Sequence, residues 1–275
     1  TVLSGGDALG PQLTAHEGIA KVSFTGSTAT GRRVMASAAS TLKRVTLELG
    51  GNDPAIVLPD ADVAKVAKRL FMGAFLNSGQ VCIAAKRIYV HDSIYDAFAQ
   101  AFAAIAAAAP VGPGADERTV IGPVQNRPQY ERVKSLIEAT RAAGHRFLAG
   151  GEMPAGPGYF IPPTVVDNPP DDARVVAEEP FGPIVPLLRY ADVDEAVRRA
   201  NASEYGLGAS VWGQDLVQAR SVAARLEAGT VWINTIHLLN PHAPFAGRKQ
   251  SGLGVENGVE GLLEFSTPQT LAVAG

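Results

Sequence analysis

The chain alternates between two hydrophobic patterns, and each pattern predicts one kind of secondary structure. Short runs of Val, Ile, Leu and Phe between turn residues predict strands, whereas apolar residues spaced three or four apart predict helices. The predicted strands cover residues 22–24, 44–48, 55–58, 87–91, 182–188, 208–212 and 229–234. One predicted helix begins near residue 61, and others cover residues 93–109, 127–143, 192–201 and 215–228. This alternation predicts an α/β fold with a mostly parallel sheet.

Capping residues and loops indicate where these elements end. Asp60 and Ser93 are predicted N-caps. Residues 150–163 and 241–254 are rich in Gly and Pro and predict loops. Residues 268–274 have an extended, β-compatible pattern, and a strand there needs a sheet edge in its own subunit or in a neighbouring one.

The composition mainly excludes classes of function. With 275 residues, 46% of them hydrophobic, the chain can bury a sizeable core. A net charge of −3 at pH 7 gives no basic surface for a nucleic acid. The longest apolar stretch, residues 97–109, is too short to cross a bilayer. The single cysteine fits a reducing, cytoplasmic compartment, and the five histidines lack the spacing of metal ligands, so no metal site is expected.

The first candidate site lies at residues 24–33, where an apolar strand runs into Gly26 and hydroxyl residues open a helix. The free N–H groups and the positive dipole end of a helix bind anions, and Gly26 would let a phosphate come close to the backbone. The spacing matches neither the usual dinucleotide fingerprint nor a Walker A loop. Ser27 and Thr28 can equally be ordinary N-cap residues.

The second candidate is Glu48, a carboxylate that ends an apolar strand and is followed by two glycines. The carboxyl edge of a parallel sheet is where ligands of α/β proteins usually bind. Partial burial there would raise the pKa of Glu48 and allow it to act as a general base near neutral pH. The alternative is a surface glutamate that closes a strand.

The third candidate is Cys82, the only cysteine of the chain. Residues 77–80 predict a loop, and residues 83–86 predict the first turn of a short helix. A thiol at a helix N-terminus is expected to have a lowered pKa and the reactivity of a thiolate. A single cysteine is otherwise most often a small buried hydrophobic residue.

Five motifs in order make the chain resemble the NAD(P)-dependent aldehyde dehydrogenase superfamily. The motifs are FTGS (24–27), LELGG (47–51), GQVC (79–82), EEPFGP (178–183) and PFAGRKQSG (244–252). Each is weak by itself, and their shared order and spacing make the resemblance specific. It covers essentially the whole chain and implies an aldehyde dehydrogenase-like fold.

The resemblance implies that Cys82 attacks the aldehyde and forms a thiohemiacetal, which becomes a thioester when hydride leaves to NAD or NADP. Glu48 would then activate the water that releases the carboxylic acid. Glu256 resembles an accessory glutamate that relays protons in some members. The cofactor-binding residues implied by the resemblance are Gly26, Ser27, Leu49, Glu179 and Phe181. The residues implied to line the aldehyde tunnel are Ile83, His237, Leu238 and Phe245.

Members of the superfamily are considerably longer on the N-terminal side, so the resemblance implies that this chain is a C-terminal portion. Residues 1–48 would be the last part of a Rossmann-like NAD(P)-binding domain, and residues 49–250 the catalytic domain. Residues 251–275 would be a return segment and possible oligomerisation strand, in a homodimer or homotetramer. Asn52 stands where many members carry Lys.

The tunnel residues favour an apolar or aromatic aldehyde over a dicarboxylate semialdehyde, for which an Arg beside the 236–239 loop is expected. Two other functions remain open. One is a catalytically incomplete aldehyde dehydrogenase-like scaffold, and the other is a thiol esterase that uses Cys82 and Glu48 without a cofactor.

Overall fold

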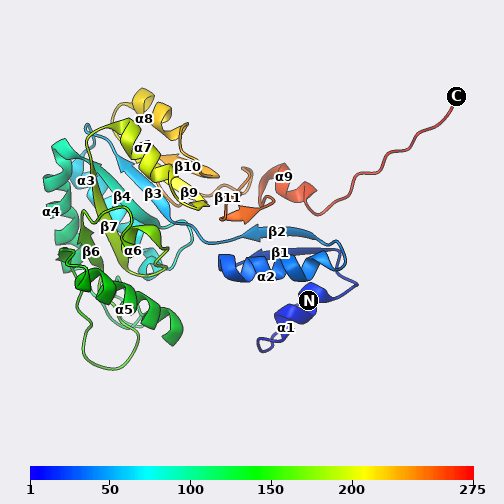
Figure 1. Cartoon of the computed structure of the whole chain (residues 1–275), viewed down its shortest axis with the longest axis horizontal. Helices are drawn as coiled ribbons and strands as arrows, with labels where there is room; N and C mark the ends of the chain where they lie inside the picture. The colour runs from blue at the N-terminus through cyan, green and yellow to red at the C-terminus, as the bar shows by residue number, and fades with distance from the viewer. The chain divides into compact units, whose positions relative to one another are not determined.

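The computed structural model describes residues 1–275, and the chain divides into two compact units (Figure 1). Unit 1 contains residues 1–50 and 239–275, and unit 2 contains residues 51–238. No helix in the chain combines the length and apolar character needed to cross a bilayer.

Unit 2 is built on a seven-stranded sheet with the strand order β10-β9-β3-β4-β7-β6-β5. All neighbouring strands are parallel except the edge strand β5, which pairs antiparallel with β6. The strands of this unit are β3 (Asp53–Val57), β4 (Ala85–His91), β5 (Phe147–Ala149), β6 (Thr164–Asp167), β7 (Ile184–Tyr190), β8 (Tyr205–Gly206), β9 (Gly208–Trp212) and β10 (Thr230–Ile233). The predicted mostly parallel sheet is therefore confirmed.

Helices cover both faces of this sheet because successive strand residues point to opposite sides. In β3, Ala55 and Val57 pack in the core that contains α3 and α4, whereas Ile56 packs in the core that contains the other helices of this unit. One face carries α3 (Val63–Phe75) and α4 (Asp92–Ala108). The other face carries α5 (Arg127–Ala142), α6 (Arg174–Ala177), α7 (Val193–Asn201) and α8 (Leu216–Ala223).

Unit 1 contains a smaller three-stranded sheet, in which β2 lies between β1 and β12. Strands β1 (Lys21–Thr25) and β2 (Arg44–Glu48) are parallel, and β12 (Gly252–Leu253) runs antiparallel to β2. The unit also contains α1 (Leu9–Ala15), α2 (Thr28–Ala39), β11 (Arg248–Lys249) and α9 (Gly258–Leu263). Its small core contains Val34 of α2 and Leu47 of β2, so helix and sheet pack through a few apolar residues.

Most predicted elements are present, but several boundaries differ. Helix α3 begins at Val63 and is capped by Asp62, whose side chain accepts a hydrogen bond from Lys65 N. The prediction of Asp60 as this cap was wrong, because its carboxylate instead accepts hydrogen bonds from the backbone of residues 214–215. His91, rather than Ser93, caps α4.

Two predicted segments at the C-terminal side also differ from the structure. Residues 241–254, predicted as a loop, contain the short strands β11 and β12. Residues 268–274 form no strand within this chain. The compact units also divide the chain differently from the predicted domains, because residues 239–250 join unit 1 together with residues 251–275.

Candidate active site

Cys82 lies in a turn that connects a helical segment to a buried strand of unit 2. The chain leaves α3, passes through the 3₁₀ helix η1 (Leu76–Gly79) and enters residues 81–84, which we call the Cys82 turn. A hydrogen bond from Ala84 N to Val81 O (3.0 Å) closes this turn, and β4 begins directly after it. The helical turn predicted at residues 83–86 is absent, because β4 begins at Ala85, which pairs with Asp53 of β3, and Lys86 lies at an irregularity in this pairing.

Three consecutive residues before this turn have left-handed backbone conformations. The φ angles are 51° at Asn77, 58° at Ser78 and 72° at Gly79. Such a run is unfavourable for L-residues, and side-chain hydrogen bonds hold it in place. Ser78 Oγ donates to Gly122 O (2.9 Å), and Asn77 Nδ2 donates to Gln80 O (3.2 Å). The approach to Cys82 is therefore a fixed piece of backbone.

The ammonium group of Lys86 lies beside the Cys82 turn and is almost completely buried. The Lys86 side chain is 3% exposed. Its Nζ donates to Cys82 O (2.7 Å), to Gly51 O (2.8 Å) and to Glu179 Oε1 (3.0 Å). The sequence analysis missed this residue, because lysine is usually exposed and two of its three partners are distant in the sequence.

The electrostatics of Cys82 differ from the expectation of a lowered pKa. Burial raises the pKa of the Cys82 thiol, the Lys86 ammonium opposes this effect, and the charges of Asp53 and Glu179 add to the rise. The prediction was wrong because no helix N-terminus supports the thiolate. The thiol of the free protein is therefore protonated near neutral pH and must lose its proton before it attacks a carbonyl.

Asp53, at the start of β3, is a buried carboxylate in the same region. It is 3% exposed, and neither of its side-chain oxygens has a hydrogen-bond partner. Burial raises the pKa of Asp53 to about 7, although the Lys86 ammonium and the nearby backbone N–H of Gly208 lower it in part. A Cβ atom on Gly51 would come within 2.7 Å of Asp53 Oδ1 and within 2.8 Å of Cys82 O. Asp53 and the Cys82 turn therefore both lie close to the side of Gly51 on which a side chain would stand.

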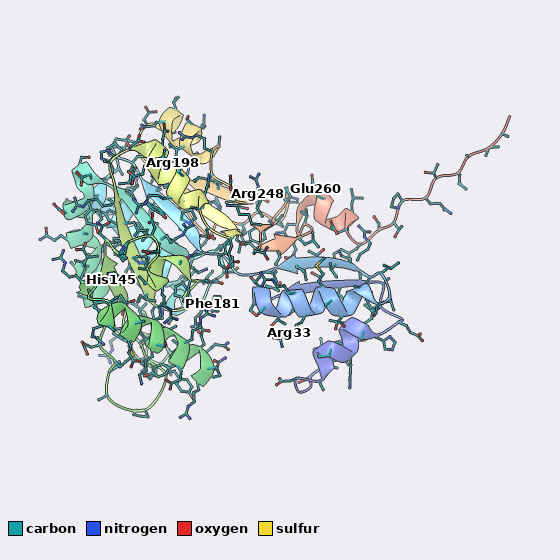
Figure 2. All side chains as sticks on the ribbon, viewed as in Figure 1. Arg33, His145, Phe181, Arg198, Arg248 and Glu260 are labelled. Atoms are coloured by element: carbon teal, nitrogen blue, oxygen red, sulfur yellow. The ribbon has the colours of Figure 1, made fainter.

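Glu179 lies in residues 178–183, which we call the Glu179 loop and which leads from α6 to β7. Helix α5 holds this loop, since Arg132 donates to Glu179 O (2.9 Å) and Gln129 donates to Phe181 O (2.9 Å). Glu179 Oε1 accepts from Lys86 and, at 3.3 Å, from Gly51 N. Phe181, labelled in Figure 2, is half-buried and has a left-handed φ of 45°. The second oxygen of Glu179 has no such partner and can accept hydrogen bonds from a ligand.

The structure brings together two of the four predicted substrate-lining residues. His237 Nε2 lies 3.1 Å from Ile83 O, next to the nucleophile, and burial lowers the pKa of His237. Leu238 is 67% exposed, and only its carbonyl is engaged, by Trp232 Nε1 (2.8 Å). Phe245 is buried and lies in unit 1.

A cavity of about 640 Å³ opens beside His237. Its apolar wall includes Ile236, which belongs to the predicted 236–239 loop, and Met72 and Leu76, which the sequence analysis did not identify. The charged residues Lys65, Lys68 and Arg69 also line it. Arg69 donates to Asn234 O (2.8 Å), so an arginine does lie beside the loop that leads to His237.

Glu48 ends β2 in unit 1, as predicted, and its backbone is fixed by both neighbouring strands. Glu48 O accepts from Gly26 N (3.0 Å), and Glu48 is paired with Gly252 of β12. The side chain is 4% exposed, and its two oxygens have no hydrogen-bond partner. Burial, followed by repulsion from Glu256, raises the pKa of Glu48 to about 8. The expectation of a raised pKa is confirmed.

Glu256, the predicted accessory glutamate, lies close enough to Glu48 to influence its ionisation. Its backbone forms a reciprocal pair with Phe245, with N–O distances of 2.7 and 2.8 Å. Ser23 Oγ donates to Glu256 Oε1 at 3.4 Å. Glu256 therefore provides a second, half-buried carboxylate near Glu48 within unit 1.

The predicted cofactor residues of unit 1 also have clear packing roles. Ser27 is the N-cap of α2, as the alternative interpretation proposed, and its side chain accepts from Thr30 N (3.3 Å). A Cβ atom on Gly26 would come within 2.5 Å of the end of the Phe24 ring, so a larger residue there would displace this ring. Leu49 is buried against Gly31 of α2. The free N–H groups at the start of this 12-residue helix remain suited to an anion.

Comparison with known proteins decides the family. The sequence profile of the aldehyde dehydrogenase family matches residues 1–271. The chain belongs to the aldehyde dehydrogenase family. Aldehyde dehydrogenase LUC3 of Fusarium sp is 46% identical over 274 residues, which are 99% of this chain and 58% of that protein. Betaine aldehyde dehydrogenase of Rhizobium etli is 43% identical over 275 residues, or 56% of its own length.

Solved structures of aldehyde dehydrogenases have the same fold. The NAD⁺ complex of the Bacillus cereus enzyme matches with a TM-score of 0.90 at 42% identity, covering 93% of this chain and 52% of that one. Betaine aldehyde dehydrogenase of Staphylococcus aureus, also in complex with NAD⁺, matches with a TM-score of 0.92 at 38% identity, covering 96% and 53%. The chain thus spans slightly more than half the length of the relatives that it matches.

Proposed function

We propose that this chain is the C-terminal portion of an NAD(P)-dependent aldehyde dehydrogenase that oxidises an aldehyde to a carboxylic acid. The observation that carries this proposal is the half-buried thiol of Cys82, positioned next to the Lys86–Glu179 ion pair. Family membership gives the reaction class, and the residues around Cys82 provide a nucleophile and an anionic group for a cofactor.

Cys82 is the proposed nucleophile. Its sulfur, as the thiolate, forms a C–S bond with the aldehyde carbon, and the electron pair of the C=O π bond moves to the oxygen, giving the tetrahedral thiohemiacetal anion. When bound, NAD or NADP supplies the acceptor for the hydride that leaves this carbon. A thioester between Cys82 and the acyl group then remains on the protein.

Glu48 is the proposed general base of the second half-reaction. It takes a proton from water, whose oxygen attacks the thioester carbon, and the C–S bond breaks to release the acid and the Cys82 thiol. A pKa of about 8 suits this role, because a carboxylate with a raised pKa is a stronger base than an exposed glutamate. Glu256 is the proposed second carrier for the proton that Glu48 takes up.

The residues present fit a dinucleotide. The second oxygen of Glu179 can accept hydrogen bonds from ribose hydroxyls, because Lys86 and Gly51 N hold only the first. Phe181, fixed on the same loop by Gln129, would pack against the nicotinamide ring. The Gly26–Ser27 turn, at the start of α2, would face the pyrophosphate, as helix N-termini do.

We propose an apolar or aromatic aldehyde as substrate. Ile83 and His237 border the nucleophile, and the cavity beside His237 has an apolar wall. Arg69, on the same cavity, donates to Asn234 O of its own chain, which fixes the guanidinium at the cavity wall while it keeps its positive charge. Leu238 and Phe245 remain proposed tunnel residues. We further propose that the protein is cytoplasmic and assembles as a homodimer or homotetramer.

The decisive experiment is to mix the protein at its full natural length with benzaldehyde and NAD⁺ and to follow the absorbance of NADH. We predict that wild-type protein forms NADH and that Cys82→Ala loses this activity by several orders of magnitude, because no covalent intermediate can form. Activity of Cys82→Ala above a tenth of wild type would refute the assignment of the nucleophile.

The same preparation separates the two alternatives. Hydrolysis of p-nitrophenyl acetate without any NADH formation from benzaldehyde would favour a cofactor-independent thiol esterase. A folded protein that shows neither reaction would favour a scaffold.

A further inference from the structure

The buried ion pair beneath the Cys82 turn has a geometry that the proposed chemistry does not by itself require. An ammonium group removed from water is costly unless all of its protons find acceptors. Lys86 Nζ has three acceptors at 2.7 to 3.0 Å, which equals the number of protons that it can donate. The cation is therefore fully satisfied and held at one position.

The three acceptors belong to three separate segments of unit 2. Cys82 O lies in the Cys82 turn, Gly51 O precedes β3, and Glu179 Oε1 belongs to the Glu179 loop. The backbone just before the Cys82 turn also touches the Glu179 loop, because a Cβ atom on Gly79 would overlap with Gly182 O. A displacement of Lys86 would therefore disturb the nucleophile and the Glu179 carboxylate together.

We propose that Lys86 is a positioning residue whose single ammonium holds the Cys82 turn and the carboxylate of Glu179 at a fixed distance from each other. The inference rests on the proposed function for the statement that Glu179 faces the cofactor. It assigns to Lys86 the task of keeping the nucleophile and the cofactor-binding carboxylate in register, and of supplying positive charge beside the thiol.

The charged and titratable groups around Cys82 and Lys86 determine the pH at which the Cys82 thiol ionises. Lys86 stabilises the Cys82 thiolate, whereas Asp53 and Glu179 destabilise it. His237 is hydrogen-bonded to Ile83 O of the Cys82 turn. Burial and the Lys86 charge lower the pKa of His237, so its imidazole is uncharged at pH 7 and above. Removal of the Lys86 charge should therefore raise the pKa of the Cys82 thiol, and removal of the Glu179 charge should lower it.

The test is the pH dependence of Cys82 alkylation by iodoacetamide in the protein at its full natural length, quantified by mass spectrometry of the peptide that contains Cys82. Relative to wild type, Lys86→Met should raise the midpoint by about one pH unit, the lower end of what one nearby charge produces. Glu179→Gln should lower the midpoint. Lys134→Met, which removes a partly exposed lysine of α5, is the matched control and should leave it unchanged.

A purely structural role of Lys86 would not produce opposite shifts. An unchanged midpoint in folded Lys86→Met, or a shift of the same sign in both variants, would overturn the proposal. If Lys86→Met does not fold, the alkylation midpoint of Glu179→Gln still tests the proposal. This variant should fold, because the Glu179 side chain is partly exposed and the amide keeps a hydrogen-bonding oxygen. An unchanged midpoint in that variant would overturn the proposal as well.

A second measurement concerns the cofactor. Calorimetry should show that Lys86→Met weakens NAD⁺ binding about tenfold, the loss of one charge-assisted contact. In the Glu179→Gln background the same substitution should weaken binding less than twofold, because Lys86 acts through Glu179. Additive losses would overturn this part of the proposal. If neither variant changes NAD⁺ affinity while the alkylation shifts persist, the cofactor role of Glu179 fails and the coupling of Lys86 to Cys82 stands.

Discussion

At the scale of single residues, Glu48 and Asp53 share an uncommon situation, because both carboxylates are buried and have no hydrogen-bond partner. Desolvation raises the pKa of Glu48 to about 8 and that of Asp53 to about 7. Buried groups without partners cost stability, and such costs are typical of sites where function requires a particular ionisation. Glu48 has a proposed task in the chemistry, and Asp53 lies next to the Lys86 cluster.

The raised pKa of Glu48 predicts how deacylation depends on pH. The active form of a general base is deprotonated, and Glu48 stays protonated up to about pH 8. The hydrolysis rate of a preformed acyl-enzyme should therefore rise about tenfold per pH unit below this value and level off above it. Stopped-flow measurement of acyl-enzyme decay in the protein at its full natural length tests this prediction.

Glu48→Gln is the control for that profile. It should hydrolyse the acyl-enzyme about 10²- to 10⁴-fold more slowly, which is the usual contribution of a general base, and without the step near pH 8. An unchanged profile in Glu48→Gln would assign the titration to another group.

At the scale of elements, one glycine limits the geometry before Cys82. Gly79 has a φ of 72°, and a Cβ atom there would overlap with Gly182 O. Gly79→Ala should therefore lower the free energy of unfolding by about 2 kcal/mol or more, from the left-handed backbone and from the steric overlap. Thermal unfolding followed by circular dichroism measures this loss.

Gly122→Ala is the matched control for Gly79→Ala. It lies beside Ser78, and the only atom near its added Cβ would be Ser78 Oγ at 4.0 Å. Gly122→Ala should change the unfolding temperature little. If Gly79→Ala is tolerated equally well, the backbone before Cys82 is less constrained than the structure indicates.

The sequence predicted the elements whose pattern is local. Residues 44–48 and 208–212 are strands with the predicted limits, because each contains at least one β-branched residue and is followed within two residues by a glycine. Residues 83–86 were misread as helical, because Ala and Lys favour helices locally, whereas residues 83 and 84 form a turn and β4 begins at Ala85 through its pairing with Asp53 of β3. Two-residue strands such as β12 have no pattern of their own and form only through a distant partner.

The residues of the candidate site were likewise predictable only where they stand in a local sequence motif. Cys82 and Glu48 stand in recognisable motifs, and the resemblance identified both. Lys86 could not be found in this way, because its importance lies in contacts with Gly51 and Glu179, which are 35 and 93 residues away. Burial of a lysine follows from the assembled fold rather than from the residues beside it.

At the scale of the whole molecule, the proposed residues divide between the two compact units. Unit 1 contains Glu48 and Glu256, and unit 2 contains Cys82, Lys86 and Glu179. In the proposed mechanism, loss of unit 1 would remove the base of deacylation, whereas loss of unit 2 would remove the nucleophile on which both half-reactions depend.

The small sheet of unit 1 predicts weak cofactor binding by these 275 residues alone. Dinucleotide sites in doubly wound folds extend over several β-α units, whereas the sheet of unit 1 has two parallel strands and one short antiparallel strand. Calorimetry should give a dissociation constant for NAD⁺ of about 1 mM or weaker. Micromolar affinity together with full turnover would show that these residues suffice.

The measurement that tests the central claim most directly is the mass of the covalent intermediate in Glu48→Gln. We predict that this variant, at its full natural length and mixed with benzaldehyde and NAD⁺, accumulates an adduct with the mass of the aldehyde minus two hydrogen atoms. Peptide mapping should place the adduct on Cys82, and wild type under the same conditions should accumulate much less, since Glu48 drives its hydrolysis. Absence of an adduct on Cys82, or equal accumulation in wild type and Glu48→Gln, would contradict the account.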